Sequence, residues 1–294
     1  MRIFVTGASG FVGSAVVDEL IANGHQVTGL ARSDDSAAKV EQAGATVLRG
    51  ELTDLDSLRR GVESADAVIH TAFVHDFSKF EESCAIDAAA INAMAEVLRG
   101  SEKPMLVTGG TALEKSGRLG LESDKPIAGF PRQSDKLALE LAAEGLRVSS
   151  LRLPQVHGDG MRFGFINMFI DVARQSGKSA YIGDGGNCWC SVHRADAARV
   201  YRLAIERGAE GGPFHAVAEE AIPTKTLAEL FGRKLGVPVV SISAEEAQAH
   251  FGWLATFIQL DMATSSAHTR ALLGWEPREE GVMADLETAK IWTA

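Results

Sequence analysis

Directly after its first apolar run, Arg2 to Thr6, the chain reads Thr6-Gly7-Ala8-Ser9-Gly10-Phe11-Val12-Gly13. This turn stands between a predicted strand and a predicted helix. Gly7 lets the backbone bend sharply off the strand, and Gly10, which lacks a Cβ, lets the chain approach a pyrophosphate. Gly13 lets the helix pack closely, and the unpaired N–H groups at the helix start attract phosphates. The turn therefore predicts a dinucleotide site that includes Ser9, Phe11 and Val12, the alternative being a Gly-rich turn that binds nothing.

The first half of the chain alternates short β-rich runs with longer helical segments. The candidate strands are rich in Val, Ile or Leu: Arg2 to Thr6, Gln26 to Ala31, Thr46 to Arg49, Ala67 to Thr71, Met105 to Thr108 and Val148 to Leu153. Repeated βα units predict an α/β fold, a Rossmann-type doubly wound parallel sheet with helices on both faces. We expect Thr53 to cap one helix and Pro131 to take the first position of another.

After Leu153 the pattern loosens into a second, smaller unit. Helices are predicted over Phe165 to Gln175, Ala195 to Arg207, Thr224 to Leu235, Ala244 to Phe251 and Gly281 to Ile291, with a strand near Ser191. We assign 1–155 to the dinucleotide-binding domain and 156–294 mainly to a substrate-binding region, with a segment of about 191–217 returning to the first domain. Since no long linker separates them, the two parts should form one body with a cleft between them.

The composition is that of an ordinary globular protein, with 294 residues, 46% hydrophobic and 23% charged. The formal charge is −10 and no Lys/Arg-rich run is present, which argues against a nucleic-acid partner. No apolar run approaches the roughly 20 residues of a membrane span, and we expect a cytoplasmic protein. Three cysteines, Cys84, Cys188 and Cys190, suit neither a disulfide framework nor a zinc site, so no metal is expected.

The end of the second predicted strand bears on which dinucleotide binds. NAD enzymes place an Asp or Glu there, whereas this chain reads Ala31-Arg32-Ser33. The guanidinium of Arg32 can hold a 2′-phosphate and Ser33 can add a hydroxyl donor, while the nearest carboxylates, Asp34 and Asp35, lie further into the loop. The pattern favours NADP(H) over NAD(H), the alternative being that Arg32 is a solvated surface cation.

Further motifs accompany the glycine turn along nearly the whole chain. They read Arg49-Gly50-Glu51-Leu52-Thr53-Asp54, Ile69-His70-Thr71-Ala72, Leu151-Arg152-Leu153-Pro154, Val156-His157-Gly158, Gly183-Asp184-Gly185, Val192-His193-Arg194-Ala195-Asp196 and Leu273-Gly274-Trp275-Glu276-Pro277. In these motifs the chain resembles the extended short-chain dehydrogenase/reductase superfamily, in its NAD-dependent epimerase/dehydratase-like group. The resemblance implies that Glu51 and Leu52 lie against the adenine, Ala72 beside the cofactor ribose, and Pro154 to Val156 beside the nicotinamide. Thr71 and Thr108 complete the implied cofactor-binding set.

The chain departs from that superfamily at the catalytic residues, which are normally a Tyr four positions before a Lys. Here Arg132 stands four positions before Lys136, and neither Tyr181 nor Tyr201 belongs to such a motif. Glycine occupies the usual serine position after the fifth strand, with Thr111 the nearest hydroxyl. The resemblance implies that Lys136 holds the nicotinamide ribose. If the chain is a reductase, hydride transfer to a carbonyl would be assisted by another donor: Arg132, Thr111, Thr108, or Tyr181 reaching in from the second unit.

Three functions remain open on the sequence. The favoured one is NADP(H)-dependent reduction of a small hydrophobic carbonyl compound, or the reverse oxidation, with Arg132 stabilising the alkoxide and solvent supplying the proton. The second is a catalytically silent NADP(H)-binding regulator. The third is a sugar-nucleotide epimerase or dehydratase, disfavoured because its chemistry depends most on the missing phenol. By analogy the chain would pair as a homodimer through helices near Ser83 to Leu98 and Arg132 to Ala143.

Overall fold

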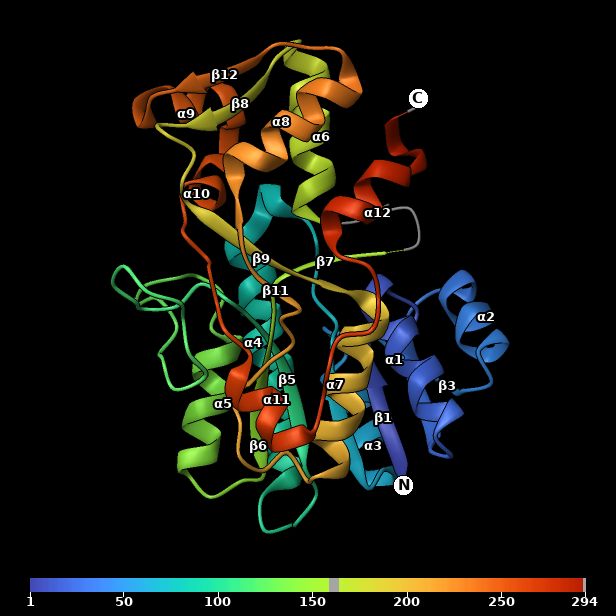
Figure 1. Cartoon of the computed structure of the whole chain (residues 1–294). Helices are drawn as coiled ribbons and strands as arrows, with labels where there is room; N and C mark the ends of the chain where they lie inside the picture. The colour runs from blue at the N-terminus through green and yellow to red at the C-terminus, as the bar shows by residue number, and fades with distance from the viewer. Residues whose placement is uncertain (159–163, 293–294) are drawn as a thin grey trace.

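The computed structural model describes residues 1–158 and 164–292. Its larger part is built on a seven-stranded parallel sheet in the order β10-β6-β5-β4-β1-β2-β3 (Figure 1). The strands are β1 (Arg2–Thr6), β2 (Gln26–Ala31), β3 (Thr46–Arg49), β4 (Ala67–His70), β5 (Met105–Gly110), β6 (Val148–Leu153) and β10 (Phe214–His215). The predicted α/β fold with a Rossmann-type parallel sheet is confirmed, and the six predicted strands match β1 to β6 to within two residues.

Helices cover both faces of this sheet. One face carries α1 (Phe11–Ala22), α2 (Asp34–Gln42) and α7 (Arg194–Glu206), and the other carries α3 (Leu55–Ser64), α4 (Phe80–Leu98) and α5 (Ser134–Ala143). In β1, Ile3 and Val5 join the core on the α1 side, whereas Phe4 joins the core on the α3 side. This alternation explains why the strand is apolar throughout, because successive side chains point to opposite, equally buried faces.

The order of the strands reverses beside β1, which pairs with β2 on one side and β4 on the other. The connections that leave the ends of these strands therefore diverge to opposite faces of the sheet. In open α/β sheets this divergence opens a crevice at the carboxyl ends of the strands, where ligands bind. The glycine-rich turn after β1 lies at that point.

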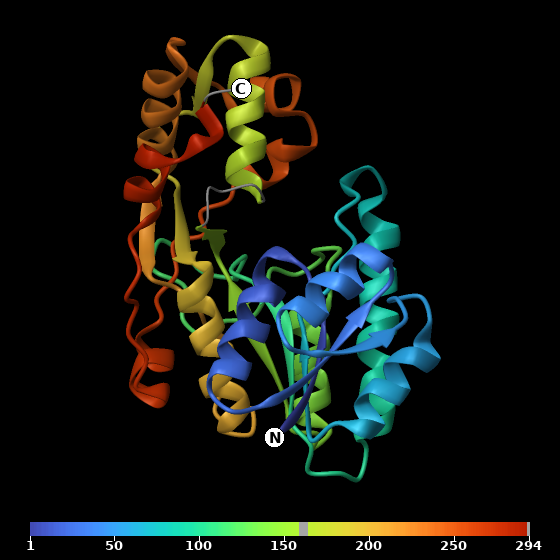
Figure 2. The same cartoon turned by 90° about the vertical axis from the view of Figure 1, so that its right-hand side faces the viewer.

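A smaller lobe with its own apolar core lies beyond the carboxyl ends of the sheet (Figures 1 and 2). It contains a three-stranded sheet and a two-stranded parallel sheet: β7 (Gln155–His157), β9 (Cys188–His193) and β11 (Glu219–Pro223), then β8 (Ser179–Ile182) and β12 (Val239–Ile242). Its helices are α6 (Phe165–Ser176), α8 (Thr224–Leu235), α9 (Ala244–Phe251), α10 (Ala255–Ile258) and α12 (Val282–Thr288).

The chain crosses between the two lobes more than once. After β9 it enters α7, which packs along α1, and then β10, which pairs with β6 at the edge of the large sheet. It then returns to the smaller lobe at β11, and α11 (Ala267–Leu273) later packs beside β10 and α7. Within 1–158 and 164–292, no helix combines the length and apolar character needed to cross a bilayer.

Two helix starts differ from the prediction. The N-cap of α3 is Asp54, whose carboxylate accepts a hydrogen bond from the amide of Ser57 at 3.2 Å, so Thr53 precedes the cap. Helix α5 begins at Ser134, so Pro131 lies outside it. The later start leaves Arg132 in a non-helical segment, where its side chain reaches the end of β5.

Candidate active site

The turn after β1 is packed so tightly that Gly7 and Gly13 leave no space for a side chain. Gly7 has a φ of +72°, and a Cβ there would lie 2.7 Å from Thr71 Oγ1 and 2.8 Å from the amide nitrogen of Ala72. A Cβ on Gly13 would lie 2.0 Å from the carbonyl oxygen of Gly7. The turn, the start of α1 and the end of β4 therefore form one rigid unit.

The N-terminus of α1 is suited to an anion. Its N-cap is Gly10, which offers no side-chain cap, and its first turn contains no acidic residue. The backbone amides and the positive end of the helix dipole therefore face no competing carboxylate. The guanidinium of Arg194, which the sequence interpretation missed, lies 4.9 Å over the Phe11 ring and donates to Ser14 Oγ at 2.9 Å. These features fit the diphosphate of a dinucleotide.

The segment after β2 has a more complex arrangement than predicted. Arg32 is exposed at the strand end. The hydroxyl of Ser33 caps α2, accepting from the amide of Ser36 and donating to its Oγ at 3.1 Å, so its predicted role as a phosphate donor competes with the cap. Arg49, at the end of β3, pairs with Asp34 at 2.8 Å and holds its carboxylate. A second guanidinium thus lies at this end of the site, next to the motif that contains Glu51.

The two residues predicted to face the adenine follow β3 directly. Glu51 is exposed, and Leu52 is half-buried against the core on the α3 side of the sheet. Between β6 and β7, Pro154 is buried, and Val156 pairs with Val192 of β9. These residues therefore lie at the carboxyl ends of β3 and β6.

A buried hydrogen-bond network connects the ends of β1 and β4 with α4 and α5. His70 Nε2 lies 3.1 Å from Asp87 Oδ1 and its Nδ1 lies 2.7 Å from Thr6 Oγ1, while Ser134 Oγ donates to Asp87 Oδ2 at 2.5 Å. Burial raises the pKa of the Asp87 carboxyl, but the hydrogen bond and charge of His70, then the charge of Arg132, outweigh it and hold that pKa below its ordinary value. Asp87 is therefore an ionised anchor.

Arg132 is held from three sides at the edge of this network. Its Nε donates to Ser134 Oγ at 2.9 Å, its Nη2 donates to the Thr108 carbonyl oxygen at 3.0 Å, and its guanidinium lies 4.3 Å over the ring of Phe73. The side chain keeps 23% of its surface exposed. A fixed, partly exposed positive charge therefore stands at the end of β5.

Thr108 also engages a tyrosine that the sequence interpretation set aside. Thr108 Oγ1 donates to the His70 carbonyl oxygen at 2.7 Å, so the phenol of Tyr201, 2.6 Å away, must donate to Thr108 Oγ1. Tyr201 is fully buried, and that burial raises the pKa of its phenol. The phenol is a structural donor with no open path to a substrate.

Three of the predicted catalytic residues do not join this network. Lys136 extends from the first turn of α5 with 59% of its side chain exposed, and its Nζ lies 3.7 Å from Glu140 Oε1. The buried hydroxyl of Thr111 accepts a hydrogen bond from Cys190 Sγ at 3.4 Å. Tyr181 lies on β8 in the smaller lobe, with Lys225 over its ring. The structure brings together Thr108 and Arg132, and not these three residues.

A cluster of aromatic rings adjoins Arg132 through Phe73, over whose ring the guanidinium lies. We call it the aromatic cluster, and it consists of Phe73, His75, Phe77, Phe80, Phe130, Phe165, Trp253 and Phe257. The larger lobe contributes rings around the start of α4 and before α5. The smaller lobe contributes rings from α6, the 3₁₀ helix η2 (Gly252–Leu254) and α10. Phe77 stacks on Trp253 with centroids 4.5 Å apart.

The aromatic cluster is not an ordinary core. Trp253 is 42% exposed, and the six phenylalanines are half-buried. Half-exposed rings that converge from two lobes beside a fixed cation form a surface suited to an apolar ligand with one polar group. Periodicity analysis missed the cluster because its members come from separate chain segments.

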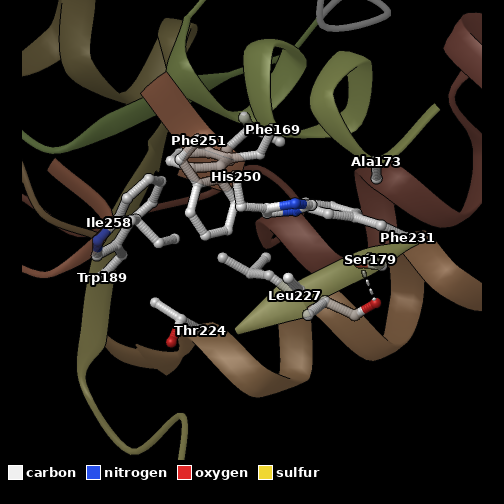
Figure 3. A pocket seen from close by; sticks show the side chains of 13 residues that line it. Phe169, Ala173, Ser179, Trp189, Thr224, Leu227, Phe231, His250, Phe251 and Ile258 are labelled. Atoms are coloured by element: carbon white, nitrogen blue, oxygen red, sulfur yellow. Dashed lines mark hydrogen bonds between the residues drawn. The ribbon is translucent and has the colours of Figure 1, made fainter. Parts of the chain in front are cut away.

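A separate small cavity lies inside the core of the smaller lobe (Figure 3). It is lined mainly by apolar side chains of α6, α8 and α9, and the part a water molecule can enter is about 20 Å³, roughly one water. His250 Nε2 and Trp189 Nε1 are buried there without a hydrogen-bond partner among the described residues, while Ser179 donates to the Ala228 carbonyl oxygen. The cavity is too small to hold a substrate.

Comparison with known proteins agrees with this architecture. A model of the NAD dependent epimerase/dehydratase family matches residues 3–218. The chain is 51% identical to the uncharacterized protein C2A9.02 of Schizosaccharomyces pombe, over 97% of this chain and 98% of that one. It is 26% identical to a 4-hydroxy-2-methyl-3-oxo-4-farnesyl-3,4-dihydroquinoline-1-oxide ketoreductase of Stigmatella aurantiaca, over 86% and 80%. The structure of the dTDP-glucose 4,6-dehydratase DesIV of Streptomyces venezuelae, with NAD and TYD bound, has a TM-score of 0.74 at 19% identity, covering 99% and 97%.

Proposed function

The chain belongs to the NAD-dependent epimerase/dehydratase family, and from that premise we propose that it is an NADP(H)-dependent oxidoreductase of small apolar carbonyl compounds and their alcohols. Proteins of this family bind a nicotinamide dinucleotide. The observation that carries the proposal is the position of Arg132, a fixed cation at the end of β5 whose guanidinium lies over Phe73, a member of the aromatic cluster. The ketoreductase among the relatives supports carbonyl chemistry.

The residues that would bind the dinucleotide lie along the carboxyl ends of the strands of the large sheet, each group near a different part of it. The turn from Gly7 to Gly13 and the N-terminus of α1 would hold the diphosphate, with Arg194 adding positive charge. Arg32 would hold the 2′-phosphate, which is the basis for proposing NADP(H). Leu52 would lie against the adenine and Ala72 beside the ribose.

A nicotinamide bound at the carboxyl ends of the strands would supply the hydride for reduction, or accept it in the reverse direction. Arg132 would stabilise the negative charge that develops on the substrate oxygen, because a guanidinium stays charged near neutrality and does not act as a proton donor. Its bonds to Ser134 and Thr108 fix its direction before substrate arrives, so little reorganisation is needed. The aromatic cluster would exclude water and hold the apolar part of the substrate.

The test is NADPH oxidation by the purified protein against a panel of carbonyl compounds. Arg132→Gln should lower kcat by about 10²–10³-fold, the usual loss for one oxyanion-stabilising donor, and leave coenzyme affinity unchanged. Arg59→Gln is the matched control, since this arginine pairs with Asp56 and Glu96 on α3 and α4. Turnover that survives Arg132→Gln unchanged would refute the assigned role.

A second candidate is a catalytically silent NADP(H)-binding regulator. The observation that favours it is the outward position of Lys136, which pairs with Glu140, together with arginine in place of the usual tyrosine. Coenzyme binding measured by calorimetry, with no turnover of any compound in the panel, would support this candidate. A nucleotide-sugar epimerase or dehydratase is the third, and it would be recognised by turnover of a nucleotide sugar.

A further inference from the structure

His75 lies in the aromatic cluster next to Arg132. Its imidazole meets the ring of Phe73 edge to face with centroids 5.6 Å apart and the ring of Phe77 at 6.0 Å. The guanidinium of Arg132 lies over the same Phe73 ring at 4.3 Å. The Phe73 ring therefore contacts the His75 imidazole at one side and the Arg132 guanidinium on its face, and His75 keeps part of its surface open to solvent while its ring packs in the cluster.

The hydroxyl groups of Thr71, Thr108 and Ser134, which lie after β4, in β5 and at the start of α5, already donate their protons to other atoms of the fold. Thr71 Oγ1 donates to the Thr6 carbonyl oxygen at 2.7 Å, Thr108 Oγ1 to the His70 carbonyl oxygen, and Ser134 Oγ to Asp87. Each of these hydrogen bonds joins the ends of strands or helices. A hydroxyl group that gave its proton to a substrate would therefore lose a contact inside the larger lobe. The imidazole of His75 has the Phe73 carbonyl as a polar contact, but it holds no two elements of the fold together and is partly open to solvent, so it can give up a proton and recover one from water.

We propose that His75 donates the proton that completes carbonyl reduction, in place of the missing tyrosine. The inference rests on the proposed reductase function. The hydride forms the new C–H bond, the π pair of the C=O bond moves onto oxygen, and Arg132 stabilises the resulting charge. The oxygen then takes a proton from the His75 imidazolium, leaving alcohol, oxidised coenzyme and a neutral imidazole. That imidazole recovers a proton from solvent, and in the oxidation direction it acts as the base.

The charges around His75 set the pH at which this step operates. Burial in the cluster and then the positive charge of Arg132 lower the pKa of His75, partly offset by the Phe73 carbonyl. The neighbouring Asp76 carboxylate is held by Ser78, and Lys79 lies 3.8 Å from Glu82. The cluster segments of the smaller lobe, 165–168 and 252–258, contain no charged residue. Reduction should therefore speed up as pH falls below 6.5, and oxidation should slow down.

The experiment measures kcat for reduction from about pH 5 to about pH 8 in wild type and His75→Gln. In the variant kcat should fall by about 10²–10⁴-fold, the range of general acid catalysis, and lose its rise at low pH, with coenzyme affinity unchanged. Free imidazole should restore part of the activity of His75→Ala. His268→Gln, which alters an exposed histidine on α11, is the control and should behave as wild type.

A second readout needs no turnover. In an NMR titration the His75 imidazole should titrate below 6.5, and Arg132→Gln should raise that value because it removes a nearby positive charge. The inference would be overturned if kcat of His75→Gln still rose at low pH. It would also be overturned if Arg132→Gln left the pKa of His75 unchanged. Wild-type protein that binds coenzyme but turns over no carbonyl compound would instead refute the proposed function, and the inference with it.

Discussion

Gly10 and Gly13 belong to the same glycine-rich turn, but the space available for a Cβ differs between them. A Cβ on Gly13 would lie 2.0 Å from the Gly7 carbonyl oxygen, whereas one on Gly10 would lie 3.1 Å from the same atom. Gly13→Ala must therefore push α1 away from the turn, and we expect it to lower the free energy of unfolding by about 1–3 kcal/mol and to weaken coenzyme binding by more than tenfold.

Denaturant unfolding and calorimetric titration measure the two effects of Gly13→Ala separately. Gly10→Ala is the matched comparison, because its smaller overlap should leave stability nearly unchanged while still obstructing the diphosphate. Equal stability losses in the two variants would show that the packing at Gly13 has been misread.

Arg32 provides the test of coenzyme choice. Its side chain is exposed after β2, while the nearest carboxylate, that of Asp34, is held by Arg49. Arg32→Ala should weaken the binding of NADP(H) by about tenfold, or roughly 1.4 kcal/mol, because it removes a charge-assisted contact with the 2′-phosphate. The affinity for NAD(H) should stay unchanged. Calorimetry with both coenzymes makes the comparison, and Arg60→Ala on α3 serves as a control. A similar loss for both coenzymes would remove the argument for NADP(H).

The catalytic positions show how far single residues could be predicted. The motif spacing predicts that Arg132 stands in place of the tyrosine, and in the structure its guanidinium donates to the Thr108 carbonyl oxygen. The spacing also suggested Lys136, yet α5 begins at Ser134 and directs that lysine toward solvent. The partnership of Tyr201 with Thr108 spans 93 residues and connects α7 with β5, so no local pattern could reveal it.

At the scale of elements, the buried Arg152 of β6 joins this strand to β10 through a hydrogen bond with His215. Arg152 donates to Asp135 Oδ2 at 2.9 Å and to the carbonyl oxygens of Glu122 and Asp124. Its Nη1 lies 3.1 Å from His215 Nε2, which must accept because a guanidinium can only donate. His215 Nδ1–H therefore donates to the Ser265 carbonyl oxygen at 2.7 Å, and the imidazole is neutral.

This arrangement predicts a pH dependence of stability. Burial, with the charge of Arg152 acting in the same direction, lowers the pKa of His215 from 6.5 to about 4. Between these values the unfolded chain binds a proton that the folded protein does not, so stability falls as the pH is lowered through this window, by about 3 kcal/mol in all. Denaturant unfolding of wild type and His215→Gln should show the loss in wild type and a smaller slope in the variant. Parallel slopes would contradict the assignment.

The elements themselves were largely predictable, because β-branched and apolar runs mark the strands and glycines mark the helix ends. Gly24, Gly44, Gly100 and Gly145 each follow a helix with positive φ. The start of α3 was misplaced by one residue, because Thr53 and Asp54 are both good caps and only the geometry selects the carboxylate. Local chemistry thus located the elements and left their ends uncertain.

At the scale of the whole molecule, the proposed substrate surface exists only because the two lobes meet. Rings from the start of α4 contact rings of η2 and α10, as in the stack of Phe77 on Trp253. The sequence predicted a second, substrate-binding unit with a cleft between it and the first, but composition and periodicity carry no information on which distant rings will meet. The sheet was therefore predictable and the aromatic cluster was not.

Trp253 tests whether this surface binds substrate. It is the most exposed ring of the smaller lobe in the cluster and makes no hydrogen bond to Arg132 or to the turn after β1, so its loss should affect apolar binding alone. Trp253→Ala should raise KM for an apolar carbonyl compound by about tenfold, because about 1–2 kcal/mol of binding free energy from apolar contact is lost. The values of kcat and of coenzyme affinity should change little. The KM of Trp253→Phe should lie between the values of wild type and Trp253→Ala. Steady-state kinetics with a short-chain and an aromatic aldehyde make the measurement, since the loss should be larger for the aromatic one. A fall in kcat with KM unchanged would instead place Trp253 in the chemical step or in lobe closure, and the cluster would not be a binding surface.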